Sequence, residues 1–196
     1  MILTAVFLLL LSLIFALLEI EIEGKYGWAE KIPTWHKKSK MFSFLASKKP
    51  LTGYHLFMLL FIFMLFHFVF FVGLKWSLSL ELRIISYFIL FLVIEDFLWF
   101  VFNPYYGLKK FKKDKIWWHY NSKWIFNLIP LDYIIGIFLS ILLMYFSSVA
   151  SDNLQILFEF LYSLSFILIL ILAISIFLPE PYKKWYYFMR KNNKEN

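Results

Sequence analysis

Apolar residues along the chain gather in five long blocks, separated by polar segments that carry most of the lysines. A helix needs about 20 mainly apolar residues to cross the hydrocarbon core of a bilayer. All five blocks reach this length, so the pattern predicts spans at residues 2–20, 54–74, 84–102, 131–150 and 154–178. We therefore expect an all-α integral membrane protein: one domain, a bundle of about five transmembrane helices with interfacial loop helices.

The first block resembles a secretory signal peptide only in its length and apolarity. No basic segment precedes it, and it runs into Glu19, Glu21 and Glu23 without a small-residue cleavage site. We interpret it as a retained membrane helix.

The basic residues predict the orientation of the chain in the membrane. Of the 20 lysines and arginines, 18 fall in the loops at residues 21–53 and 103–130 or in the tail at residues 179–196. Only Lys75 and Arg83 lie on the opposite side of a five-span arrangement. Because basic loops stay in the cytoplasm, we expect the N-terminus outside the cytoplasmic membrane and the C-terminus inside.

The composition excludes several classes of protein. Hydrophobic residues make up 62% of the chain, well above the content of a water-soluble domain. The absence of cysteine excludes disulfides, thiolate metal sites and cysteine nucleophiles. The net charge of +7 predicts contact with anionic lipid head groups at the bilayer surface, and no nucleic-acid-binding module is present. Homo-oligomerisation stays open.

Acidic residues inside the predicted spans are the most informative positions, because ionisable groups there are costly and usually mark function. Glu95 and Asp96 are adjacent in the third span, and Asp96 precedes Asn103 by seven residues, or roughly 10 Å of helix. We expect both to face the bundle interior. Glu19 and Glu23 are four residues apart and share one helical face, where they repel each other unless a positive group lies between them.

Three further groups are predicted at the same end of the bundle. His55 begins the second span, Asp132 begins the fourth, and His119 lies in the loop that covers this end. Two ionisable residues fall elsewhere. His67, in the middle of the second span, is best explained by a hydrogen bond to a carbonyl group, and Glu159 by its closeness to the outer interface.

The first functional hypothesis is a metal-dependent membrane enzyme that acts on a lipid-like substrate. Carboxylates and imidazoles suit a divalent metal such as zinc, iron or manganese, which would activate a bound water. The candidate metal ligands are Glu19, Glu23, His55 and Asp132. The candidate catalytic residues are Glu95, Asp96 and His119. The candidates for binding substrate or a lipid head group are Lys109, Lys110 and Asn103.

Two other classes stay open. In a cation- or proton-coupled transporter or channel, Glu95 and Asp96 would bind and release the cation or proton. In a noncatalytic membrane subunit, the aromatic surface would contact partner proteins. Gly136 and Ser140, four residues apart in the fourth span, would allow a close approach of another helix.

Two segments carry a resemblance. One runs from Glu23 through Trp28 to Trp35, and the other from Glu95 through Asn103 to Leu108. They resemble patterns in a group of small uncharacterised prokaryotic polytopic membrane proteins, with no established function implied. The resemblance implies that Glu23, Glu95, Asp96, Asn103 and His119 belong to one connected site.

Overall fold

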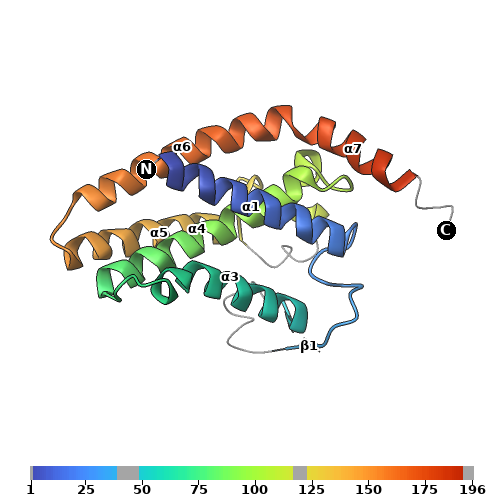
Figure 1. Ribbon diagram of the computed structural model, residues 1–196. Coiled ribbons are helices and arrows are strands. Elements are labelled where there is room, and N and C mark those ends of the chain that lie inside the picture. Colours follow the sequence, from blue (N-terminus) through green and yellow to red (C-terminus); the bar gives the residue numbers. More distant parts are fainter. Residues whose placement is uncertain (1, 39–48, 117–122, 192–196) are drawn as a thin grey trace.

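The computed structural model describes residues 2–38, 49–116 and 123–191. Five of its helices are long and apolar enough to cross a membrane. They are α1 (Ile2–Glu23), α3 (Gly53–Phe71), α4 (Leu78–Phe102), α5 (Leu131–Ala150) and α6 (Gln155–Phe177). A shorter helix, α7 (Pro179–Lys191), continues from α6 (Figure 1). The prediction of an all-α bundle is confirmed, and the chain is an integral membrane protein by the length and apolarity of these helices.

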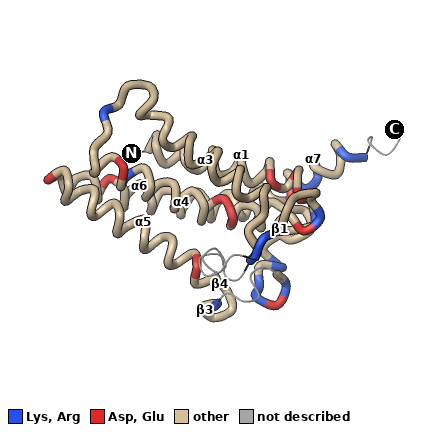
Figure 2. The backbone as a smooth tube through the Cα atoms, turned by 90° about the horizontal axis from the view of Figure 1, so that it is seen from below, with Lys and Arg blue, Asp and Glu red and all other residues tan. Residues whose placement is uncertain are grey.

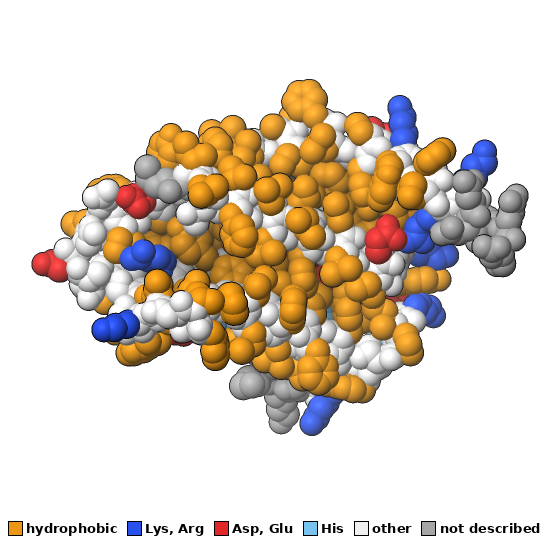
Figure 3. Space-filling model, in the orientation of Figure 1, with side chains coloured by type: hydrophobic (Ala, Val, Ile, Leu, Met, Phe, Trp, Pro, Cys, Tyr) orange, Lys and Arg blue, Asp and Glu red, His pale blue; other side chains and the backbone are white. Residues whose placement is uncertain are grey.

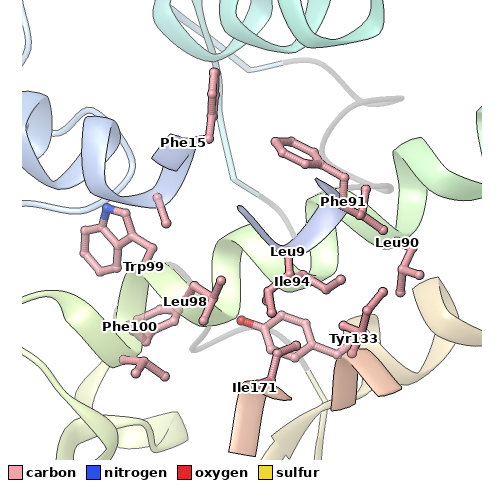
Figure 4. Close-up of a cluster of buried hydrophobic side chains, with 14 of the residues drawn as sticks. Leu9, Phe15, Leu90, Phe91, Ile94, Leu98, Trp99, Phe100, Tyr133 and Ile171 are labelled. Carbon is pink, nitrogen blue, oxygen red and sulfur yellow. The ribbon is translucent and has the colours of Figure 1, made fainter. Parts of the chain in front are cut away.

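Helix α4 forms the centre of the bundle and packs against α1, α5 and α3. In the apolar stretch of α4, 56% of the residues are buried. The corresponding share is 11% for α3, which lies at the edge of the bundle. In the core, Phe91 of α4 packs edge-on against Phe15 of α1, and Leu9, Leu98 and Phe100 belong to the same buried cluster (Figure 4). The weak packing of α3 leaves much of its surface for lipid.

The seam between α4 and α5 is held by small residues and hydroxyl groups. Gly136 lies so close to α4 that a Cβ atom there would be 2.6 Å from Val93 Cγ2. The Ser86 hydroxyl donates to the Ser140 carbonyl at 2.7 Å, and the Ser147 hydroxyl donates to the Ser79 carbonyl at 2.7 Å. The close approach at Gly136 and Ser140 that the sequence would allow does occur, and it joins two helices of the same chain.

Three helix boundaries differ by three residues or more from the sequence predictions, and the first is the end of α1 at Glu23 rather than at residue 20. Helix α4 begins at Leu78 rather than at residue 84, because Ser77 caps it by accepting from the Leu80 backbone N–H. Glu81 and Arg83 interrupt the apolar run without ending the helix. Helix α3 ends at Phe71 rather than at residue 74, because Gly73 adopts a φ of 107° that a helix does not continue.

Short paired strands close the loops. Strands β1 (His36–Lys37) and β2 (Leu51–Thr52) pair in antiparallel register and bring the first loop back to the start of α3. There the Gly53 N–H donates to the Trp35 carbonyl at 3.0 Å. A Cβ at Gly53 would be 2.6 Å from Trp35 Nε1, so glycine is needed for this crossing.

The second loop contains two single-turn 3₁₀ helices, η1 (Leu108–Lys110) and η2 (Lys113–Lys115), followed by the paired strands β3 (Trp124–Ile125) and β4 (Ile129–Pro130). The tail predicted at residues 179–196 forms the helix α7 from Pro179 to Lys191. Its Arg190 contacts Glu21 of α1 at 2.6 Å.

Charge divides the molecule along its length. Lysines gather at the end that carries β1, the second loop and α7, which we call the lysine-rich end (Figure 2). Hydrophobic side chains cover the middle of the face in Figure 3, with the charged side chains toward the two ends. This banding matches a protein that crosses an apolar layer and meets water on both sides.

Candidate functional site

A cavity of about 260 Å³ lies between α1, α3 and α4 near the lysine-rich end. Most of its wall is apolar and aromatic, but one side of it is acidic. Four carboxyl groups and one imidazole line it, from Glu19, Glu23, His55, Glu95 and Asp96. We call this the acidic cavity. It contains five of the seven residues predicted as metal ligands or catalytic groups.

Glu19 and Glu95 are two deeply buried acids of the acidic cavity. Each residue is only 7% exposed, and their carboxyl groups interact directly. Within the described ranges, Glu19 Oε1 and Glu95 Oε1 have no hydrogen-bond partner. A buried carboxyl oxygen without a partner is costly in a membrane interior. These two atoms are therefore the strongest indication that the cavity receives a ligand or protons.

Glu23 ends α1 and orders the loop that follows it. Its Oε1 accepts a hydrogen bond from the Ala29 N–H at 2.6 Å and lies 3.7 Å from His55 Nε2. The other ring nitrogen of His55 lies 2.7 Å from the hydroxyl of Thr52, the residue that caps α3. Trp28 stacks on His55 with ring centroids 4.1 Å apart. The imidazole is thus fixed at the cavity wall by groups from both loop ends.

Lys49 is a buried basic residue beside the acidic cluster. It is 8% exposed, and its Nζ lies 4.2 Å from the centroid of the Trp28 ring. Burial lowers the pKa of the Lys49 ammonium below its ordinary value of 10.5, and nearby carboxylates, Asp96 first, oppose that decrease. From the sequence, Lys49 is only one of the loop lysines that predict the orientation. Nothing in its spacing distinguishes it from the other lysines of the loop.

Asp96 and Asp132 occupy different surroundings. Asp96 lines the cavity and accepts a hydrogen bond from the Tyr133 hydroxyl of α5. Asp132 is exposed at the start of α5, outside the cavity lining, although it lies near enough to Lys49 to interact with it. Glu95 and Asp96 both face the interior, as predicted.

The predicted head-group residues lie apart from the acidic cavity. Asn103 donates to the Gly24 carbonyl at 2.8 Å and accepts from the Tyr105 N–H at 3.0 Å, so it ties α4 to the end of α1. Lys110 donates to the Tyr105 carbonyl at 2.7 Å. Lys109 lines a separate surface pocket beside α7, together with Asn103. Their predicted role in binding head groups stays a prediction.

The predicted metal centre needs at least three ligands that converge. Across residues 2–38, 49–116 and 123–191, no three His, Asp or Glu side chains lie close enough together to hold a metal ion. His119, which was predicted to act with Glu95 and Asp96, lies outside the described residues.

A second polar pair joins α3 to the start of α4. His67 Nδ1 donates to the Phe63 carbonyl at 2.8 Å, as predicted, and its Nε2 lies 3.0 Å from Glu81 Oε1. Phe66, the residue before His67, packs edge-on against Phe88 and against Phe91, which lines the acidic cavity. We call these three phenylalanines the aromatic layer.

Comparisons of the chain with protein-family models, with curated proteins and with solved structures found no match. The geometry of the acidic cavity is therefore the basis for a functional proposal. The resemblance of the segments Glu23–Trp35 and Glu95–Leu108 to small prokaryotic membrane proteins stays a prediction.

Proposed function

We propose that the protein binds a cation reversibly in the acidic cavity, in exchange for protons, with the lysine-rich end facing the cytoplasm. The single observation that supports this most strongly is the pair of unpartnered, buried oxygen atoms on Glu19 and Glu95. A function of this kind was one of the alternatives that the sequence left open. It needs fewer converging ligands than a metal-dependent enzyme does.

The charge balance of the acidic cavity supports cation binding. Four carboxyl groups line it, and Lys49 is the basic side chain buried beside them. Like charges in a low-dielectric site cannot all persist unless protons or cations neutralise them. A cation that enters would replace protons on Glu19 and Glu95, and its departure would return them.

The aromatic layer supports exchange with one side of the membrane. Phe91 lines the acidic cavity and packs edge-on against Phe66, which packs in the same way against Phe88, so this part of the cavity wall is backed by aromatic rings. The cavity lies close to the lysine-rich end, which the positive-inside bias assigns to the cytoplasm. We therefore favour a binding protein over an open channel.

Tryptophan fluorescence tests the proposal, because Trp28 and Trp99 both line the acidic cavity. Purified full-length protein in detergent is titrated separately with methylammonium, sodium, potassium and manganese(II) chlorides. We expect a saturable change in emission with at least one of these cations. Replacing both acids, as Glu19→Gln with Glu95→Gln, should abolish that change, because the amides cannot supply the negative charge.

The matched control is Glu159→Gln, which removes a carboxylate of α6 that lies outside the cavity lining and accepts from Gln155. This variant should respond as the unmodified protein does. No saturable response to any of the four cations, or an equal response in the double variant, would contradict the proposal.

A further inference from the structure

We infer that the ligand of the acidic cavity is an amphiphile with one alkyl chain and an ammonium head group, which enters sideways from the membrane between α1 and α3. The inference rests on the proposed cation binding and adds the class of molecule and its route. It follows from an apolar groove that shares a wall with the cavity.

The groove lies on the lipid-facing side of α1 and α3 and has a volume of about 790 Å³. Leu18 of α1 and Phe57 and Phe61 of α3 line it, and each of them is exposed. Because α3 packs mainly on α4 rather than on α1, these side chains do not close over the groove. In the membrane, a groove of this kind is filled by hydrocarbon chains.

Glu19 connects the groove with the acidic cavity. Its side chain lines both, as do those of Phe15 and Met58. A molecule whose chain lies in the groove would therefore place its head group at the unpartnered Oε1 of Glu19. A carboxyl oxygen at that point selects a head group that donates hydrogen bonds and carries positive charge.

The protein already recognises an alkylammonium group in this region. Lys49 is a four-carbon chain with a terminal ammonium, and its Nζ lies over the Trp28 ring at 4.2 Å beside the acids of the cavity. Trp28 also lines the cavity itself. Aromatic faces and carboxylates together favour ammonium ions. The same chemistry on the cavity side of Trp28 suits an ammonium head group from the membrane.

Native mass spectrometry of the full-length protein released from detergent tests the inference with dodecylamine as the probe. Dodecanol has the same chain without the charge, and butylamine has the charge with a short chain. We expect one dodecylamine to bind per chain, with dodecanol and butylamine each at least about tenfold weaker. Butylamine buries a much shorter chain, and about two methylene groups already account for that factor. Dodecanol carries no positive charge to place beside the carboxyl group of Glu19.

A pair of matched variants tests the route. Leu18→Trp fills part of the groove, whereas Leu10→Trp places the same side chain on the same helix outside it; the two leucines are 49% and 51% exposed. We expect Leu18→Trp to weaken dodecylamine binding and Leu10→Trp to leave it unchanged. Equal effects of the two variants would overturn the lateral route.

The outcomes separate this inference from the proposed function. If butylamine or dodecanol binds as tightly as dodecylamine while methylammonium still changes the fluorescence, the inference of an amphiphilic ligand is wrong. The proposed cation binding is then unaffected. If no amine binds and no cation changes the fluorescence, both proposals are overturned.

Discussion

At the scale of single residues, Lys49 is a buried basic group whose charge is influenced by the acids of the cavity. The groups that act on its charge come from α1, α3, α4 and α5, and they are Glu19, Glu23, His55, Asp96 and Asp132. Burial of a charged group is costly, and removal of one member of a buried charged cluster leaves the others uncompensated. Lys49 should therefore influence both the stability of the fold and its dependence on pH.

We predict that the contribution of Lys49 to the free energy of unfolding increases as the pH rises. Because burial lowers the pKa of Lys49 in the folded protein below 10.5, the unfolded chain binds more protons between the two pKa values. Stability then increases through that window by at most about 1.4 kcal/mol per pH unit. Lys49→Met should lack this increment. Unfolding followed by circular dichroism from pH 7 to pH 10 measures the difference between the two proteins.

The comparison with Lys49→Met cancels the contribution of groups common to both proteins. Tyr106 and Tyr182, whose pKa values are raised by burial, contribute in the opposite direction and only at higher pH. Identical pH profiles for the unmodified protein and Lys49→Met would show that burial does not lower the pKa of Lys49.

The sequence predicted the acids of the site better than it predicted their partners. Glu19 and Glu23 were expected on one face because helical spacing is regular, and both line the cavity. The contribution of Lys49 depends on where a long loop returns, and no local pattern encodes that position. The same limit explains why Asp132, though it begins a span, lies outside the cavity lining.

At the scale of secondary-structure elements, the contact between α4 and α5 sets the position of Asp96, since Tyr133 of α5 donates to it. Gly136 lies on the same seam, four residues from Ser140, whose carbonyl accepts from Ser86. Close packing of this kind substitutes for the hydrophobic effect, which does not drive helix association within lipid. The seam is therefore sensitive to added volume.

We predict that Gly136→Val destabilises the protein by about 1–3 kcal/mol, the usual cost of overpacking. The added side chain would meet Val93, whose Cγ2 would be only 2.6 Å from a Cβ at this position. Thermal unfolding in detergent measures the effect. Gly136→Ala combined with Val93→Ala should recover most of the stability, because the second change removes the obstructing methyl groups. No loss of stability in Gly136→Val would contradict the packing described for this seam.

At the scale of the whole molecule, the distribution of lysines predicts which end faces the cytoplasm. The chain contains no cysteine, so single cysteines can be labelled without background. Lys75→Cys, between α3 and α4, should react with a membrane-impermeant maleimide in intact cells. Lys37→Cys, in β1, should react only after the membrane is permeabilised. The reverse labelling pattern would show that the lysine-rich end faces outward, which contradicts the prediction.

The apolar blocks were sufficient to predict the bundle, because a spanning helix must satisfy its own backbone within the membrane. They could not predict that α3 packs loosely. Its apolar residues face lipid and protein alike, and composition does not distinguish the two. The groove between α1 and α3 therefore became apparent only from the arrangement of the helices.

The most direct test of the central claim is difference infrared spectroscopy of the purified protein as a cation that changes the fluorescence is added. Exchange of protons for a cation at Glu19 and Glu95 predicts a loss of protonated-carboxyl absorption and a matching gain of carboxylate absorption. The change should disappear in the Glu19→Gln, Glu95→Gln variant and persist in Glu159→Gln. An unchanged carboxyl spectrum while the cation is bound would contradict the account.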